Sequence, residues 1–119
     1  MEANDLKART KQFALSIICF VETIPQNQTG WVLGKQLLRA GTSVGANYRA
    51  ACKSRSKAEF IAKIGVVEEE ADECCYWLEL INESTLVHES KIEKLYREAS
   101  ELTAIMAASR RSASRGKDL

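Results

Sequence analysis

The chain of 119 residues contains one histidine, His88, and this scarcity removes several classes of enzyme. A di-iron helix bundle needs two Glu-x-x-His motifs, and one histidine cannot supply both. A zinc site would also lack ligands, because no second ligand pair surrounds His88. Serine-hydrolase chemistry is unsupported, since His88 is expected at a helix start with no evident buried carboxylate beside it. We therefore expect no metal and no catalytic residues.

Redox motifs are missing as well. The four cysteines, at positions 19, 52, 74 and 75, include no Cys-x-x-Cys pair. Cys74 and Cys75 are adjacent and are not expected to bridge each other. We expect four reduced thiols, with Cys74 acting as a small hydrophobe on an apolar face. No cofactor is expected.

Long apolar runs are also absent: none reaches the roughly 18 residues that a membrane span requires. The first ten residues, MEANDLKART, are polar and do not resemble a secretory signal. The contents of hydrophobic residues, 45%, and charged residues, 28%, are ordinary for one globular domain. We expect a cytoplasmic protein with no membrane partner.

Proline occurs once, at Pro25, where it ends the first of four expected helices. Apolar residues at helical spacing predict these helices, which cover residues 6–23, 31–52, 57–83 and 88–108. No alternating apolar run predicts a strand. The pattern favours an all-α fold, an up-down-up-down four-helix bundle over residues 1–108. The remaining residues, 109–119, are expected to form a basic, disordered tail.

The second of these helices is expected to be the central packing element. Its apolar and small residues share one face, at spacings of four and three: Leu37, Gly41, Val44, Tyr48 and Ala51. Gly41 and Gly45 form a ridge without side-chain bulk, and each costs the helix roughly 1 kcal/mol relative to alanine. Close packing of another helix would offset that cost. A phosphate loop is the alternative, but no Lys-Ser/Thr pair follows and no strand precedes it.

The third helix has more apolar surface than one core stripe requires. A second flank of this helix consists of Ala62, Val66, Trp77 and Leu80. We interpret the flank as a subunit interface of a homo-oligomer, because a solvent-exposed helix face should not carry a tryptophan and a leucine. The alternative is a set of scattered surface apolars, which are common.

A polar seam is predicted between the helices, formed by Ser43, Asn47, Arg49 and Glu70. Asn47 is expected to bond with Ser43 and Gln36, and Arg49 to pair with an acidic neighbour. The alternative for Asn47 and Arg49 is a ligand site. Glu70 is expected to be buried and paired beside Lys63.

Charge is segregated along the chain. Residues 1–57 hold nine basic and three acidic side chains, whereas residues 58–108 hold four basic and twelve acidic ones. Two basic clusters are candidate nucleic-acid contacts: Lys53, Arg55 and Lys57 in the link between helices, and Arg110, Arg111, Arg115 and Lys117 in the tail. Neither has interleaved aromatics for base stacking, so we expect weak, sequence-independent binding through phosphates. The alternative is a solubilising surface.

Several motifs together resemble a known family: GTSVGANYR at 41–49, then Ser56, Phe60, Lys63, Glu70, Ala71, Tyr76, Trp77 and Leu78. Over about residues 6–108 the chain resembles the four-helix bundle proteins encoded in intervening sequences of 23S ribosomal RNA genes. Two positions depart from that pattern. Ala50 stands where glutamate is usual, and Glu69 stands where lysine is common, so each removes or inverts a charge near the polar seam.

The resemblance implies an up-down bundle that assembles as a homopentamer. Proteins of the same fold include the accessory variability determinants of diversity-generating retroelements, which bind a reverse transcriptase and nucleic acid. We therefore expect a non-enzymatic scaffold or accessory protein for RNA, DNA or a nucleic-acid enzyme. A protein-interaction bundle without a nucleic-acid role is the alternative, and an unrecognised enzyme ranks last.

Overall fold

Four long helices account for almost all of the structure, a computed structural model that describes residues 2–84 and 90–116. The helices are α1 (Ala3–Val21), α2 (Gln28–Cys52), α3 (Lys57–Glu83) and α4 (Ser90–Ser114). Within those ranges no strand occurs, as the sequence predicts. None of the described helices combines the length and apolarity that a membrane span requires.

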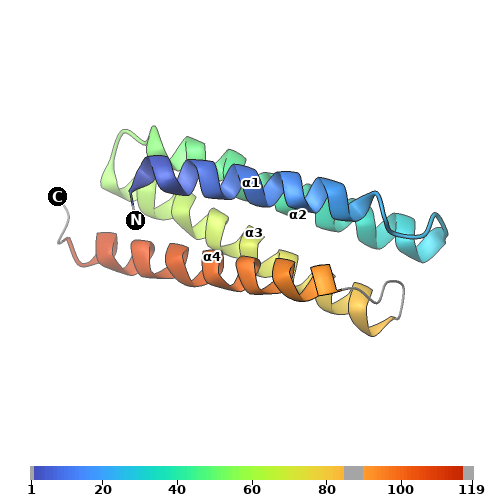
Figure 1. Cartoon of the computed structure of the whole chain (residues 1–119). Helices are drawn as coiled ribbons and strands as arrows, with labels where there is room; N and C mark the ends of the chain where they lie inside the picture. The colour runs from blue at the N-terminus through green and yellow to red at the C-terminus, as the bar shows by residue number, and fades with distance from the viewer. Residues whose placement is uncertain (1, 85–89, 117–119) are drawn as a thin grey trace.

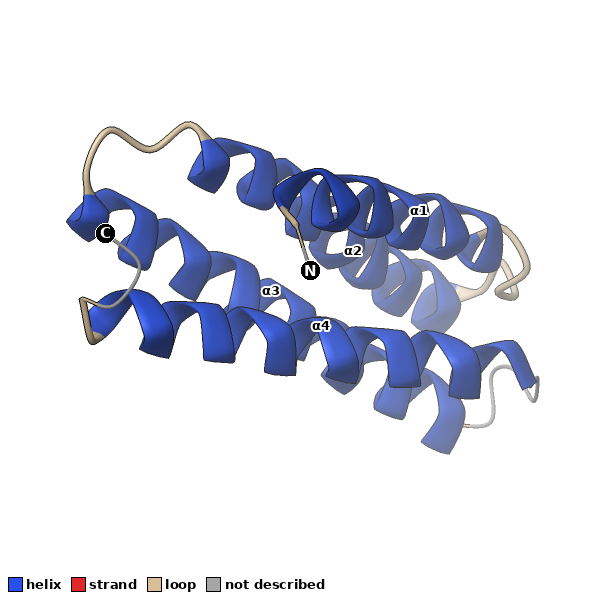
Figure 2. Cartoon of the chain, turned by 60° about the vertical axis from the view of Figure 1, so that its left-hand side comes forward, coloured by secondary structure: helices blue, strands red, loops and turns tan. Residues whose placement is uncertain are grey.

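The helices form an up-down-up-down bundle measuring 48 × 20 × 19 Å (Figure 1). Helices α2 and α3 are the central pair, α1 packs along α2, and α4 packs along α3. Contact between α1 and α4 is much less extensive. The first residues of α1 and the last residues of α4 lie at the same end of the bundle (Figure 2).

Side-chain caps set the beginnings of the two central helices. Asn27 Oδ1 accepts a hydrogen bond from the Gly30 amide at 2.8 Å, so α2 begins three residues earlier than predicted. Ser56 Oγ accepts one from the Glu59 amide at 3.1 Å, which starts α3 at the predicted residue. The end of α1 falls at Val21, ahead of the loop that contains Pro25.

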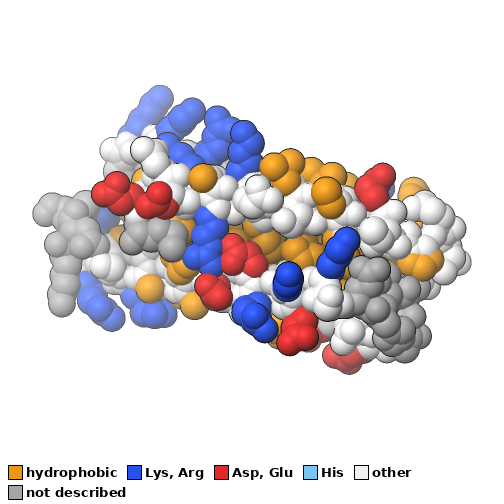
Figure 3. Space-filling view, in the orientation of Figure 1, with side chains coloured by type: hydrophobic (Ala, Val, Ile, Leu, Met, Phe, Trp, Pro, Cys, Tyr) orange, Lys and Arg blue, Asp and Glu red, His pale blue; other side chains and the backbone are white. Residues whose placement is uncertain are grey.

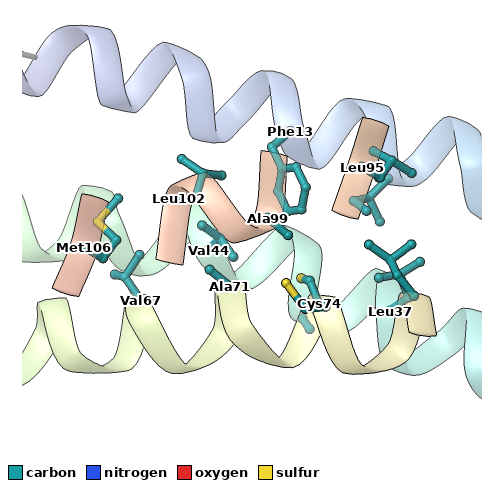
Figure 4. Packing of buried hydrophobic residues seen from close by; sticks show 14 of the residues in the cluster. Phe13, Leu37, Val44, Val67, Ala71, Cys74, Leu95, Ala99, Leu102 and Met106 are labelled. Atoms are coloured by element: carbon teal, nitrogen blue, oxygen red, sulfur yellow. The ribbon is translucent and has the colours of Figure 1, made fainter. Parts of the chain in front are cut away.

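The predicted face of α2 is confirmed as the centre of the core. All five of its residues are buried: Leu37, Gly41, Val44, Tyr48 and Ala51. In the close-up, Val44 lies opposite Ala71 of α3 and Leu102 of α4 (Figure 4). These three side chains are completely inaccessible to solvent, so three helices meet closely at mid-bundle.

The glycine ridge of α2 lies against α1. A Cβ atom at Gly41 would lie 2.9 Å from Cγ1 and Cγ2 of Ile17, and one at Gly45 would lie 3.3 Å from Oγ1 of Thr10. Thr10 is fully buried and donates its hydroxyl to the Leu6 carbonyl at 2.8 Å. The close-packing interpretation of the ridge is therefore confirmed.

The end of α4 corrects the predicted boundary of the tail. The helix continues six residues beyond Ala108, to Ser114. Ala113 is buried, and Arg110 Nε pairs with Glu68 Oε1 of α3 at 2.7 Å. Arginine and alanine are strong helix formers, and these contacts stabilise the last turn and a half of α4. Residues 117–119 of the predicted tail lie outside the described residues.

Candidate nucleic-acid interface

A groove between α1 and α2 collects four basic side chains. It encloses about 650 Å³ and is lined by Lys7, Lys11, Arg49 and Lys53, with Ala8, Ala14, Thr42, Gly45 and Ala46 between them. Each helix contributes two cations that are four residues apart and therefore share a face. The small residues between them leave room for a ligand to approach the backbone. Figure 3 shows Lys and Arg side chains gathered over the beginning of α1 and the end of α2.

The groove has no acidic lining residue, and its four cations form no ion pair within residues 2–84 and 90–116. Other arginines offset part of the negative charge of α3 and α4. Arg39 of α2 pairs with Glu70 and Glu73, and Arg9 of α1 pairs with Glu98 and Glu101 of α4. Positive potential therefore remains concentrated on the α1–α2 face.

The predicted cluster at the α2–α3 link is divided between two places. Lys53, the C-cap residue of α2, lines the α1–α2 groove. Arg55 and Lys57 instead line a separate pocket at the end of the bundle. The link therefore contributes cations to two surfaces, and proximity in sequence does not make them one site.

The predicted cluster in the tail needs a correction. The Arg110 guanidinium is tied to the Glu68 carboxylate, and this hydrogen bond raises the pKa of Arg110 above its usual value. Arg110 is thus a structural link between α3 and α4. Arg111 and Arg115 are exposed and remain candidates, whereas Lys117 lies outside the described residues.

In the polar seam the predicted contact of Asn47 with Ser43 is present, whereas the contacts predicted for Gln36 and Arg49 are not. Asn47 Nδ2 donates to the Ser43 carbonyl at 2.9 Å, as a local contact within its own helix. Gln36 accepts from Arg39 Nε instead of bonding to Asn47. Arg49 faces the basic groove and has no acidic partner among the described residues.

Glu70 is paired, but with Arg39 of α2 at 3.2 Å and not with Lys63. Lys63 points back along its own helix to Glu59 at 3.7 Å. The sequence predicts a buried Glu70, whereas its side chain is 19% exposed and therefore only partly buried. Its partner could not be identified from the sequence because it lies across the α2–α3 contact.

The second flank of α3 is partly covered by the subunit itself. Ala62 and Val66 are exposed, while Trp77 and Leu80 are half-buried. Trp77 packs against the core, and its indole Nε1 donates to Glu73 Oε1 at 3.1 Å. Any interface on this flank would therefore use Val66 and its surroundings more than the face of Trp77.

Sequence reasoning missed Lys7 and Lys11, which complete the basic groove. Their spacing of four residues was a usable signal, and Arg49 and Lys53 share it. What the sequence could not supply was the helix pairing. Thr10 lies against Gly45, and this contact sets the register that brings the two lysines of α1 beside the cations of α2.

The fold and the groove define a class of protein: an antiparallel four-helix bundle with an electropositive face. Within the described parts of the chain, no group of histidine, cysteine, aspartate and glutamate side chains could hold a metal ion. The chain belongs to the 23S rRNA-intervening sequence protein family, whose family model matches residues 2–108.

One solved structure is similar over nearly the whole length of both chains. It is a protein of unknown function from the S23 ribosomal protein family of Bacteroides thetaiotaomicron VPI-5482. The two sequences are 32% identical, and the match covers 93% of this chain and 99% of the other, with a TM-score of 0.85. A comparison with curated proteins finds no match.

Proposed function

We propose that this protein is a non-enzymatic, homo-oligomeric scaffold or accessory protein that binds nucleic acid through the α1–α2 groove. The observation that carries the proposal is a groove with four cations that, among the described residues, have no ion-pair partner and no carboxylate beside them in the lining. Such a surface neutralises backbone phosphates and releases their counterions, so binding is independent of sequence and falls steeply with salt.

Assembly strengthens this binding. A homopentamer, the assembly that the family resemblance implies, would repeat the groove around an axis. Several weak sites on one particle raise the effective concentration of each for a long strand. The same particle could hold a nucleic-acid enzyme, such as a reverse transcriptase, beside its template.

A protein-interaction bundle without a nucleic-acid role is the second candidate. It is favoured by four large apolar side chains that are exposed on α1 and α2: Leu15, Ile18, Trp31 and Val32. Trp31 is 64% exposed, with the Lys35 ammonium 5.3 Å from the ring centroid. A protein partner that covers this area would bury apolar surface which nothing covers in the single chain.

Fluorescence anisotropy with a generic duplex and a generic single strand tests the proposal at low and at physiological salt. The groove variant replaces Lys7, Lys11 and Arg49 by alanine. The matched control replaces Lys91 and Lys94, two exposed lysines of α4 outside the basic groove. We expect the groove variant to lose at least tenfold in affinity and to show a shallower salt dependence, with the control within about twofold.

Absence of binding at low salt by the intact protein would contradict the nucleic-acid role and favour the protein-interaction candidate. An equal loss per charge removed in the groove variant and in the control would mean that only net charge matters. Circular dichroism checks that each variant keeps its helices.

A further inference from the structure

A second pocket lies at the end of the bundle, where the beginning of α1, the end of α2, the beginning of α3 and the end of α4 meet. It encloses about 560 Å³. Its lining includes two aromatic residues, Tyr48 and Phe60, two cations, Arg55 and Lys57, and the hydroxyl residue Ser54. None of the described residues that line it is acidic, so this part of the pocket is cationic and partly aromatic.

Two cations sit beside the first turn of α3. Neither Arg55 nor Lys57 has a side-chain ion pair within the described ranges. The nearest acid in sequence is Glu59. Its carboxylate accepts a hydrogen bond from the backbone amide of Arg55 at 3.1 Å and pairs with Lys63 at 3.7 Å, not with the Arg55 guanidinium or the Lys57 ammonium. The positive end of the α3 dipole adds to the two cations.

Ser54 gives an independent indication of a ligand. Its hydroxyl oxygen is buried, and it is the one buried side-chain nitrogen or oxygen among the described residues without a hydrogen-bond partner. Buried polar groups are nearly always satisfied, and an unsatisfied one calls for a water, an ion or a ligand. Ser54 lines the same pocket as Arg55 and Lys57.

The fold also supplies the aromatic surface that the basic clusters lack in sequence. Tyr48 is 6% exposed and forms a wall of the pocket. Phe60 is only partly buried and also lines the pocket. A ring beside two cations is the combination that binds single-stranded nucleic acid, because a base stacks on the ring while a phosphate meets the cations.

We propose that this end pocket binds a terminal nucleotide that carries a phosphate. Arg55 and Lys57 hold the phosphate, the unpartnered Ser54 hydroxyl turns out of its buried position to join them, and the base lies on Phe60. The inference rests on the proposed function, which it deepens: the α1–α2 groove takes internal phosphates of any strand, whereas the end pocket takes a phosphorylated, unpaired end. The ligand is either the end of a strand or a free mononucleotide.

The test compares single-stranded oligonucleotides of one sequence with a 5′-phosphate, a 3′-phosphate or hydroxyls at both ends, and a blunt duplex with 5′-phosphates. Anisotropy measures binding of each strand, and calorimetry measures a free nucleoside monophosphate. For the intact protein we expect one phosphorylated strand to bind about fivefold or more tighter than the hydroxyl strand, and the duplex to show no such gain.

Variants assign this gain to the pocket. R55A combined with K57A should abolish the preference for the phosphorylated end, and F60L should reduce it while F60Y retains it. The groove variant of Lys7, Lys11 and Arg49 should weaken all strands alike and leave the preference intact. The control variant of Lys91 and Lys94 should change neither quantity.

The outcomes separate the two proposals. Equal binding of phosphorylated and hydroxyl strands, or a preference that survives both pocket variants, would overturn the end pocket and leave the groove standing. Binding of the mononucleotide without binding of any strand would support the pocket and contradict the proposed function. No binding of mononucleotide or strand would overturn both.

Discussion

Gly41 of α2 and Ile17 of α1 are in contact so close that no other residue type fits at position 41 without movement. A Cβ atom there would lie 2.9 Å from two side-chain carbons and 3.1 Å from the Cβ of Ile17. Ile17 is fully buried and branched at Cβ, so it cannot turn aside cheaply. The helix therefore accepts the propensity cost of glycine in return for the approach of α1.

Replacing Gly41 by alanine should lower the thermal midpoint, because overpacking costs about 1–3 kcal/mol and exceeds the gain in helix propensity. The same substitution at Gly65 is the matched control. A Cβ atom there would meet only Arg110 Cδ, at 3.9 Å. Gly65→Ala should stabilise α3 by about 0.5–1 kcal/mol. Equal increases in the midpoint for the two variants would contradict the close contact.

Glu98→Gln should destabilise the bundle by about 1–2 kcal/mol in chemical denaturation, because it breaks a two-pronged ion pair. Arg9 donates to both Glu98 oxygens at 2.7 Å and also reaches Glu101, which raises the pKa of Arg9 well above its usual value. The pair joins α1 to α4, whose packing is otherwise limited.

Glu93→Gln is the control for that measurement. Glu93 pairs with Arg97 at 3.6 Å, but both side chains are largely exposed. Such surface pairs contribute about 0–1 kcal/mol, so a change within about 0.5 kcal/mol is expected. If both glutamates gave the same small effect, the Arg9–Glu98 pair would not be a structural link.

The four thiols should differ sharply in reactivity. Cys19 is exposed and should react first with a thiol reagent at pH 8. Cys74 is completely inaccessible, and burial raises its pKa from 9.0 to about 12. It should therefore react only on unfolding, at a rate set by opening of the bundle. Mass spectrometry after brief labelling reads out each site, and rapid labelling of Cys74 would contradict the packing.

The raised pKa of Cys74 also has a consequence for stability at alkaline pH. The folded protein keeps this thiol protonated, whereas the unfolded chain releases the proton above about pH 9. Its contribution to stability is therefore complete below pH 9 and declines as the pH rises from about 9 towards 12. A Cys74→Ala variant should show a shallower decline over this window in urea titrations. An identical slope would contradict the assignment.

Assembly can be tested without disturbing the core. Val66 is 38% exposed on the predicted interface flank, so Val66→Glu should leave the fold intact and dissociate the oligomer. Light scattering coupled to size exclusion should give a closed homo-oligomer, a pentamer, for the parent protein. Leu15→Glu, on α1, tests a different face. Dissociation by Leu15→Glu alone would show that the interface lies on α1 and not on α3. A monomeric unsubstituted protein would show that no such interface forms.

The fold was predictable because its main signals are local. A helical stripe, a capping residue and one proline depend on neighbours within a few positions, and the buried face around Val44 is one such stripe. The end of α4 was missed since its stabilising partner, Glu68, lies 42 residues away from Arg110. Long-range partners determine whether a polar terminal turn is ordered, and the periodicity of apolar residues does not identify those partners.

The candidate sites were less predictable for the same reason. Lys53, Arg55 and Lys57 read as one cluster along the chain, but the end of α2 and the start of α3 turn them toward different surfaces. Lys11 joins Arg49 only through the packing of α1 on α2. Arg39 took the role predicted for Lys63, because Arg39 reaches Glu70 across the α2–α3 contact while Lys63 pairs with Glu59 of its own helix.

An even number of antiparallel helices brings the first residues of α1 and the last residues of α4 to one end of the bundle (Figure 1). Ala3 and Ala113 both line the end pocket there. A bulky label attached next to Ala3 or Ala113 would therefore crowd the pocket and add its own charges to any binding assay. The loop around Gln26, at the opposite end, is the position where a label would leave that surface unobstructed.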